Sequence, residues 1–191
     1  MIEPELLLQG YRLGVFPMAM ADDTIEWFSP DPRAILPLDK FHVPHALRRT
    51  LKKEVFNVRV DQRFAEVIRA CAKRKDTWIN DEIIHGYERL HELGYAHSVE
   101  TWSEGKLVGG LYGVAIGGAF FGESMFHRVT DASKVALVAL VQRLRARKFV
   151  LLDTQWLTPH LAQFGVNEIS RSHYLRLLGR AVELARTFAN E

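Results

Sequence analysis

The pattern of apolar and polar positions is most pronounced at residues 107–126. Two apolar runs, residues 107–116 and residues 119–126, flank Gly117-Gly118. Short runs rich in Val, Ile, Phe and Tyr on either side of two glycines predict a buried β-hairpin. The second run contains Glu123, and burying a carboxylate costs roughly several kcal/mol unless it has a partner. Glu123 is therefore the first candidate for a functional residue.

The rest of the chain alternates between helical and strand-like spacing. Apolar residues at intervals of three and four predict helices at residues 4–13, 44–53, 61–72, 80–91, 131–147, 157–163 and 170–188. Short apolar or alternating runs predict further strands at residues 55–60, 97–102 and 149–153. Residues 15–37 are expected to be irregular, because two prolines in three residues disfavour a helix or a central strand. This order predicts an α+β fold with a mostly antiparallel sheet flanked by helices.

Composition limits the class of protein. The chain has 191 residues, 48% hydrophobic and 25% charged, which suits one globular domain with a sizeable core. Cys71 is the only cysteine, which excludes internal disulfides and fits a reducing compartment. The amino terminus lacks the pattern of a signal peptide, and no apolar run reaches 18 residues. We therefore expect a cytoplasmic protein that makes no use of a membrane.

Charge neither demands nor excludes a nucleic-acid partner. The net charge is only +2, so contact with a nucleic acid would depend on local clusters of bases. Such clusters occur at residues 48–53, 73–75 and 143–148. Each cluster alone is most often a solvated face. Together with the aromatic loop at Trp27-Phe28 they permit RNA binding without demonstrating it.

Asp153 and Gln155 are the most informative polar pair. They follow the apolar run Val150-Leu151-Leu152, and residues two apart in an extended chain point to the same side. A carboxylate beside an amide at a strand end can bind an amine and a polarised carbonyl. Helix capping or a loop hydrogen-bond network explains the pair equally well, so the residues alone leave both interpretations open.

Other candidate motifs fail on spacing. Residues 122–126 partly match a nucleophile elbow, but Phe126 occupies the place of the second glycine, which disfavours a serine hydrolase. After His91-Glu92, Tyr95 stands where a zinc protease needs its second histidine. One cysteine and scattered histidines favour surface histidines over a ligand set. We therefore expect no metal.

Several unusual segments, in matching order, resemble the leucyl/phenylalanyl-tRNA–protein transferase family. They are residues 14–17, 27–33, 90–98, 107–126, 132–134, 153–155, 160–162 and 168–169. The resemblance covers roughly residues 10–180. It implies a GNAT-like catalytic domain at residues 37–191, preceded by a shortened N-terminal subdomain at residues 1–36.

The resemblance also implies an activity. Members of the family move Leu or Phe, and also Met, from aminoacyl-tRNA to proteins that begin with Arg or Lys. The product carries an N-degron, which marks it for degradation. Neither a cofactor nor a metal is implied, and we expect a monomer.

The family's functional positions map onto this sequence. Its catalytic residues fall on Asp153, Gln155 and Glu123. Its pocket for the amino-acid side chain falls on apolar residues, namely Leu111, Phe120, Leu137, Leu140, Leu144 and Leu152, and Met125 is assigned to substrate binding with them. Trp78 and Met18 fall on the side of the terminal adenosine, and Trp27 completes the substrate-binding set. The usual tryptophan is Met18 here, and a position that is commonly Phe is Leu140.

The implied reaction is ester aminolysis. A peptide α-amine has a pKa of about 7.7–8.0 and must lose a proton before it attacks the aminoacyl ester. Asp153 could accept or orient that proton, and Gln155 could donate to the carbonyl oxygen. Glu123 could either attract the cationic acceptor or hold Gln155 in place.

Two other functions remain possible at this stage. A GNAT-type acetyl-CoA-dependent acetyltransferase needs a glycine-rich pyrophosphate loop, but residues 127–131 contain no glycine, and Asp131 would repel phosphate. A non-catalytic RNA-binding module would account for the basic clusters but would leave the Asp153/Gln155 pair without a role.

Overall fold

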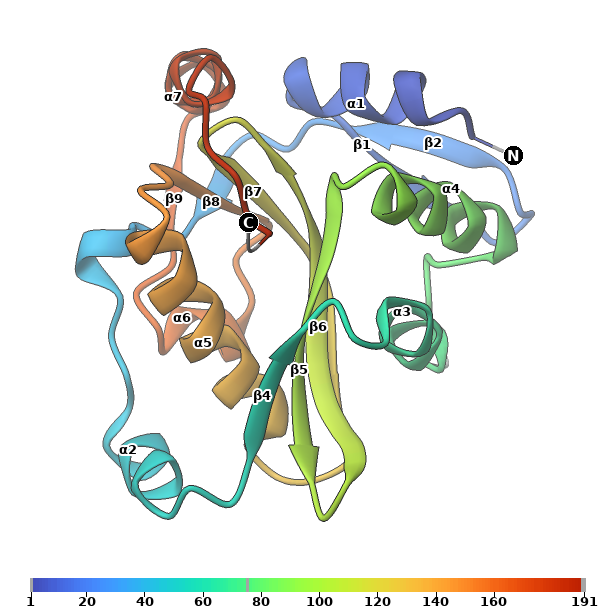
Figure 1. Ribbon diagram of the computed structural model, residues 1–191. Coiled ribbons are helices and arrows are strands. Elements are labelled where there is room, and N and C mark those ends of the chain that lie inside the picture. Colours follow the sequence, from blue (N-terminus) through green and yellow to red (C-terminus); the bar gives the residue numbers. More distant parts are fainter. Residues whose placement is uncertain (1, 75, 190–191) are drawn as a thin grey trace.

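The computed structural model describes residues 2–74 and 76–189, and within them seven strands form the central sheet (Figure 1). Across the sheet the order is β4 (Asn57–Val60), β5 (Ala96–Ser103), β6 (Lys106–Ile116), β7 (Ala119–His127), β8 (Leu151–Gln155), β3 (Arg33–Ile35) and β9 (Asn167–Ile169). Among these described strands, only β7 and β8 pair in parallel. The predicted mostly antiparallel sheet with flanking helices is confirmed.

Helices cover both faces of the sheet (Figure 1). The apolar core of one face takes side chains from α1 (Pro4–Arg12), α3 (Phe64–Ala72), α4 (Asp81–Glu92) and α7 (Arg171–Val182). The core of the other face is built mainly on α5 (Ala132–Ala146), with contributions from the 3-10 helix η1 (Leu38–Lys40), α2 (His45–Lys52) and α6 (Pro159–Ala162). The sheet therefore separates two apolar layers.

The predicted hairpin is the centre of the molecule. Strands β6 and β7 pair from Gly109 to Ile116 around the Gly117-Gly118 turn. Gly117 has φ +56°, and a side chain there would come within 2.4 Å of the carbonyl oxygen of Val182. Glycine is needed at this turn because α7 packs closely against it.

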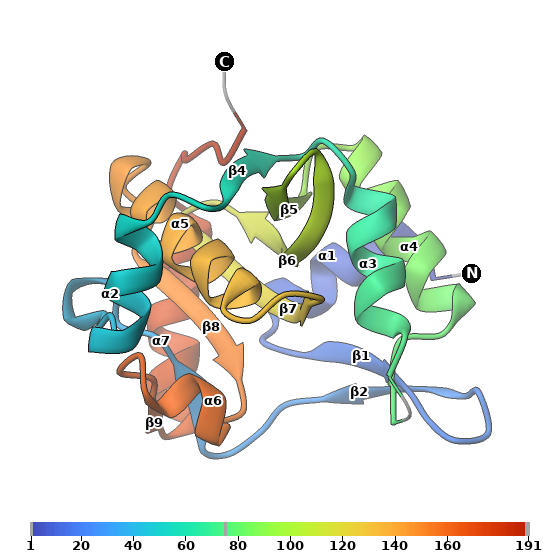
Figure 2. The ribbon, with the colours of Figure 1, turned by 90° about the horizontal axis from the view of Figure 1, so that it is seen from below.

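Residues 15–37 are more regular than expected. They contain β1 (Phe16–Ala19), β2 (Ile25–Phe28) and β3, and β1 and β2 form a separate two-stranded ribbon. Figure 2 shows this ribbon running beside the turn before α4, where the Ala19 amide donates to the Trp78 carbonyl at 3.0 Å. The prolines are accommodated because Pro17 lies in a two-stranded ribbon and Pro32 precedes β3. The prediction of an irregular segment was therefore wrong for these strands.

The ends of two other elements also differ from the prediction. Strand β9 was not predicted, and α7 ends at Val182 rather than at residue 188. The cap of α4 is as predicted, because the Asn80 side chain accepts the Ile83 amide at 3.0 Å.

The N-terminal segment shares its core with the rest of the chain. Leu7 and Tyr11 of α1 pack in the same apolar cluster as Tyr87 and Phe121. Strand β3, which ends at Ile35, lies inside the central sheet between β8 and β9. The segment is therefore in a position to supply side chains to any site on β8.

Candidate active site

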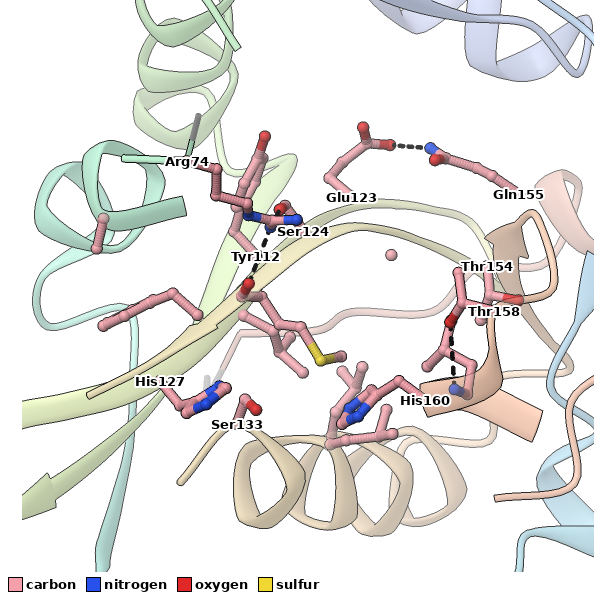
Figure 3. A pocket seen from close by; sticks show the side chains of 18 of the residues that line it. Arg74, Tyr112, Glu123, Ser124, His127, Ser133, Thr154, Gln155, Thr158 and His160 are labelled. Carbon is pink, nitrogen blue, oxygen red and sulfur yellow. Dashed lines mark hydrogen bonds between the residues drawn. The ribbon is translucent and has the colours of Figure 1, made fainter. Parts of the chain in front are cut away.

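A cavity of about 870 Å³ opens where β7 and β8 separate. The two strands pair only from Ala119 to Phe121 on β7 and from Leu151 to Asp153 on β8. Beyond these positions β7 and β8 diverge, and residues of both strands line the cavity together with residues of α5 (Figure 3). The broken pairing thus creates a concave site at the centre of the sheet.

A β-bulge places Glu123 at one end of this cavity. Tyr112 pairs with Ser124 and Gly113 pairs with Gly122, so Glu123 is the extra residue of β7. A Cβ at Gly113 would lie 2.2 Å from the Phe121 carbonyl oxygen, so the strands approach this closely only with glycine there. Bulges turn a side chain out of the regular alternation, and here the bulged residue is the buried acid.

The Glu123 carboxylate has three hydrogen-bond partners. Tyr11 donates to Oε1 at 2.7 Å and Tyr87 donates to Oε2 at 3.3 Å. Gln155 donates from Nε2 to Oε1 at 3.0 Å, as Figure 3 shows. Burial, with a smaller contribution from the negative charge of Asp153, raises the pKa of Glu123 to about 7. Glu123 can therefore change its charge near neutral pH.

Gln155 is held in an unusual backbone conformation. Its φ is +66°, in the left-handed region that residues other than glycine rarely adopt. The β3–β8 register shifts between Ala34 and Ile35, which makes Thr154 the extra residue just before Gln155. The backbone N–H of Gln155 donates to Asp153 Oδ1 at 2.9 Å, and this hydrogen bond supports the turn.

Asp153 lies beside the cavity but is sealed from it. Its side chain is fully buried, and it is not among the residues that line the cavity. Oδ1 accepts from Arg33 Nε at 3.0 Å and from the backbone N–H of Gln155. Oδ2 accepts from Arg33 Nη2 at 2.6 Å and from the Tyr174 hydroxyl at 2.8 Å. Four donors occupy both oxygens, so little capacity is left to accept a substrate proton.

The seven apolar residues that the sequence assigned to substrate binding do not all lie at the cavity. Five of them line it, namely Leu111, Met125, Leu137, Leu140 and Leu152. Phe120 and Leu144 are fully buried in the core on the α5 face and do not line the cavity. Phe120 has the strand spacing, and Leu144 the helical spacing, of the residues that line the cavity. Spacing alone therefore could not tell residues of the cavity wall from residues of the apolar core.

The other three residues assigned to substrate binding are likewise divided between the cavity and the rest of the structure. Met18 and Trp78 line the cavity, whereas Trp27 does not. The Trp27 ring lies against Gly10 of α1, where an added Cβ would come within 2.4 Å of it. Trp156, which follows Gln155, lines the cavity and is 40% exposed, but it was not predicted from the sequence.

One of the three basic clusters reaches the cavity. Lys73 and Arg74 line it, and Arg74 donates to the Met125 carbonyl at 2.9 Å. The third member of that cluster, residue 75, lies outside the described residues. Arg128, from the turn after β7, adds a further cation to the lining.

Three further residues around the site, namely Tyr11, Tyr87 and Arg33, were not predicted from the sequence. Tyr11 and Tyr87 lie on the buried apolar faces of their helices, and Arg33 directly precedes the apolar residues 34–36, so the polar group of each needs a buried partner. That signal could have been combined with the buried acids, but it does not say which acid each residue meets.

Two further structural findings concern metal binding and membranes. Among residues 2–74 and 76–189, no three His, Cys, Asp or Glu side chains gather closely enough to hold a metal ion. Within the same described part of the chain, every helix is too short or too polar to cross a membrane.

Comparisons with solved structures give only distant similarities. L-PGS from Bacillus licheniformis is 17% identical, with a TM-score of 0.45 over 84% of this chain and 55% of that chain. A functionally unknown conserved protein from Staphylococcus epidermidis is 8% identical, with a TM-score of 0.47 over 89% of this chain and 65% of that chain.

Sequence comparisons are far closer. The family described as leucyl/phenylalanyl-tRNA protein transferase matches residues 35–179, and the N-terminal domain of that family matches residues 1–31. The protein named leucyl/phenylalanyl-tRNA–protein transferase from Akkermansia muciniphila is 56% identical, over 95% of this chain and 97% of the relative. The protein of the same name from Herpetosiphon aurantiacus is 54% identical over 98% of both chains. This chain therefore belongs to the leucyl/phenylalanyl-tRNA–protein transferase family.

Proposed function

We propose that this protein transfers leucine or phenylalanine, and also methionine, from aminoacyl-tRNA to acceptor proteins that begin with Arg or Lys. The transfer would create an N-degron. Membership of the family supports the donor and the reaction. The observation that carries the proposal is the Glu123–Gln155 hydrogen bond at one end of a cavity with apolar walls. Such a site offers polar groups to the reacting atoms and a dry wall to an apolar side chain.

The groups at the site fit ester aminolysis. The acceptor nitrogen forms a bond to the aminoacyl carbon, the bond from that carbon to the ribose oxygen breaks, and a proton passes from nitrogen to the leaving oxygen. Gln155 Nε2 gives one hydrogen to Glu123, and its second hydrogen has no acceptor among the described residues. That hydrogen can stabilise the negative charge that develops on the carbonyl oxygen.

Glu123 is the better placed of the two acids to act on the acceptor. It lines the cavity, and its pKa of about 7 suits a group that takes up and releases protons near neutral pH. As a carboxylate it also attracts a cationic acceptor end and keeps Gln155 in place. Asp153, sealed by Arg33 and Tyr174, acts by holding the Gln155 backbone.

The remaining lining residues suit the end of an aminoacyl-tRNA. Leu137, Leu140 and Leu152 would contact the amino-acid side chain, and Met18 and Trp78 would contact the adenosine. Three buried atoms of the lining, Tyr112 Oη, Thr154 Oγ1 and His160 Nε2, have no hydrogen-bond partner within the described residues. Polar atoms of this kind are available to substrate hydroxyl or amino groups.

We further propose that residues 1–36 form the N-terminal subdomain of a cytoplasmic monomer and that residues 37–191 form its catalytic domain. The family's N-terminal and main sequence models, which match residues 1–31 and 35–179, support a division near this point.

Acetyl-CoA is a poorer substrate for this site. The turn that leads into α5 carries Asp131, whose carboxylate accepts from Thr50 at 2.8 Å and from Lys134 at 2.9 Å. A pyrophosphate at this helix end would meet that negative charge.

The activity test uses both possible donors. Purified protein is mixed with Leu-tRNA and a peptide that begins with Arg, and separately with acetyl-CoA and the same peptide. We expect leucylation only, measured by mass spectrometry of the peptide. Acetylation without leucylation would reject the proposed function.

Replacing Leu140 with phenylalanine should change the choice of amino acid. Leu140 lines the cavity from α5, so a larger ring there reduces the room for a bulky substrate side chain. A misfit of about one methylene is typically worth about 1–3 kcal/mol of discrimination. In a competition between Leu-tRNA and Phe-tRNA for one peptide, we expect Leu140→Phe to shift the ratio of products toward Leu without abolishing activity.

The matched control for this competition is Val138→Ile. Val138 is buried on the same helix but does not line the cavity, so its enlargement should leave the ratio unchanged. A folded Leu140→Phe variant with the wild-type ratio would show that Leu140 belongs to the core alone.

A further inference from the structure

Arg33 is a buried cation that the proposed chemistry does not use. Its side chain is 1% exposed, and it comes from β3, at the end of the N-terminal segment. The guanidinium lies between two aromatic rings, 4.9 Å from the centroid of Phe16 and 4.4 Å from that of Tyr174. An arginine is rarely buried so deeply unless paired, so its partners indicate what it does.

The guanidinium of Arg33 binds its partners as a rigid, two-pronged fork. Nε and Nη2 donate to the two oxygens of Asp153 at 3.0 and 2.6 Å, and Nη1 donates to the Gly14 carbonyl at 3.0 Å. Tyr174, whose hydroxyl lies 3.4 Å from Arg33 Nη2, also donates to Asp153 Oδ2 at 2.8 Å. A planar bidentate pair fixes the orientation of the carboxylate, which the point charge of a lysine cannot do.

The orientation of Asp153 in turn fixes Gln155. Asp153 Oδ1 accepts from Arg33 Nε, and it also accepts from the backbone N–H of Gln155 at 2.9 Å. Gln155 needs this support because its φ of +66° is unfavourable for a residue with a side chain. From that backbone position its Nε2 reaches Glu123 at 3.0 Å. A continuous series of short contacts therefore runs from Arg33 through Asp153 and Gln155 to Glu123.

We propose that Arg33, supported by Tyr174, is a positioning residue for the transfer reaction. It fixes the orientation of the Asp153 carboxylate, which binds the backbone N–H of Gln155. The side-chain amide of Gln155 is thereby kept aimed at the reacting carbonyl. Because Arg33 belongs to the N-terminal segment, that segment completes the active site. This inference rests on the proposed function, since the reaction it serves is aminoacyl transfer.

The test separates positioning from binding and from folding. Arg33→Lys keeps the charge and removes the fork, and Tyr174→Phe keeps the ring over Arg33 and removes one hydrogen bond to Asp153. The assay measures leucyl transfer from Leu-tRNA to a peptide that begins with Arg, with thermal unfolding of each variant recorded in parallel. We expect Arg33→Lys to lower kcat about 10-fold to 10²-fold and Tyr174→Phe to lower it by a smaller factor, since small misplacements of this kind have such effects. The KM for either substrate should stay within about twofold of the wild-type value.

Arg143→Lys and Tyr95→Phe are the matched controls. Arg143 also lies over a ring, 4.9 Å from the centroid of Phe188, and donates to the carbonyl of that residue, but it does not line the cavity. Tyr95 is partly buried against the core of the α1 face and does not line the cavity either. Both controls should keep the wild-type kcat.

The inference fails if folded Arg33→Lys and Tyr174→Phe keep the wild-type kcat. It also fails if KM rises at constant kcat, or if the loss of activity simply follows the loss of folded protein. A wild-type protein that does not transfer leucine rejects the proposed function instead, so the two failures are distinguishable.

Discussion

The single-turnover rate of leucyl transfer is expected to fall about 10²-fold when Gln155 is replaced by alanine. In the proposed reaction the change removes the Nε2 hydrogen that would stabilise the carbonyl oxygen, and loss of one such donor costs about 2.7 kcal/mol of transition-state stabilisation. It also removes one of the three partners of the Glu123 carboxylate. The measurement is a rapid-mixing experiment with Leu-tRNA and enzyme in excess over the peptide.

Gln142→Ala is the control for this prediction. Gln142 is exposed on α5 and does not line the cavity, so its loss should leave the rate unchanged. Unfolding temperatures of both variants show whether the fold is intact. A folded Gln155→Ala variant that transfers leucine at a near-normal rate would contradict the role assigned to the amide.

The elements that the sequence predicted well are those with long, unbroken patterns. The β6–β7 hairpin has two apolar runs and a two-glycine turn, and α4 has a capping Asn80 before its apolar stripe. The strands that the sequence missed are three or four residues long. Strands this short form because a neighbouring strand is present, and their own residues carry too little periodicity to reveal them.

Most of the residues predicted for the candidate site line the cavity, but their relations to one another were not predicted. Asp153 and Gln155 were expected to face the substrate together, since residues two apart share a side of a strand. The extra residue Thr154 and the left-handed backbone of Gln155 break that rule, and Asp153 meets Arg33, 120 positions earlier in the chain. Bulges and long-range ion pairs depend on tertiary packing, so spacing along the sequence could not show them.

The pH dependence of kcat should depend on Glu123. Its pKa of about 7 means that the ionised fraction falls to about a tenth at pH 6 and to about a hundredth at pH 5. The reaction needs the carboxylate, because only this form accepts a proton from the acceptor and keeps both oxygens as acceptors for Tyr11, Tyr87 and Gln155. For the wild-type protein at saturating substrates, kcat should therefore fall about tenfold per pH unit below pH 7 and level off above pH 8.

The variant Glu123→Gln shows whether this carboxylate or the acceptor amine causes the fall of kcat at low pH, the acid limb of the pH profile. The amide keeps the shape of the side chain but cannot ionise, so kcat at pH 8 should be about 10-fold to 10²-fold lower. Without the carboxylate the variant depends on acceptor that is already deprotonated, so its acid limb should follow the free pKa of the amine, about 7.7–8.0, and level off about one pH unit higher than that of the wild-type protein. If the variant and the wild-type protein instead share one acid limb, the limb belongs to the amine. Glu123 would then serve only to hold Gln155, the second of the two roles that the sequence left open.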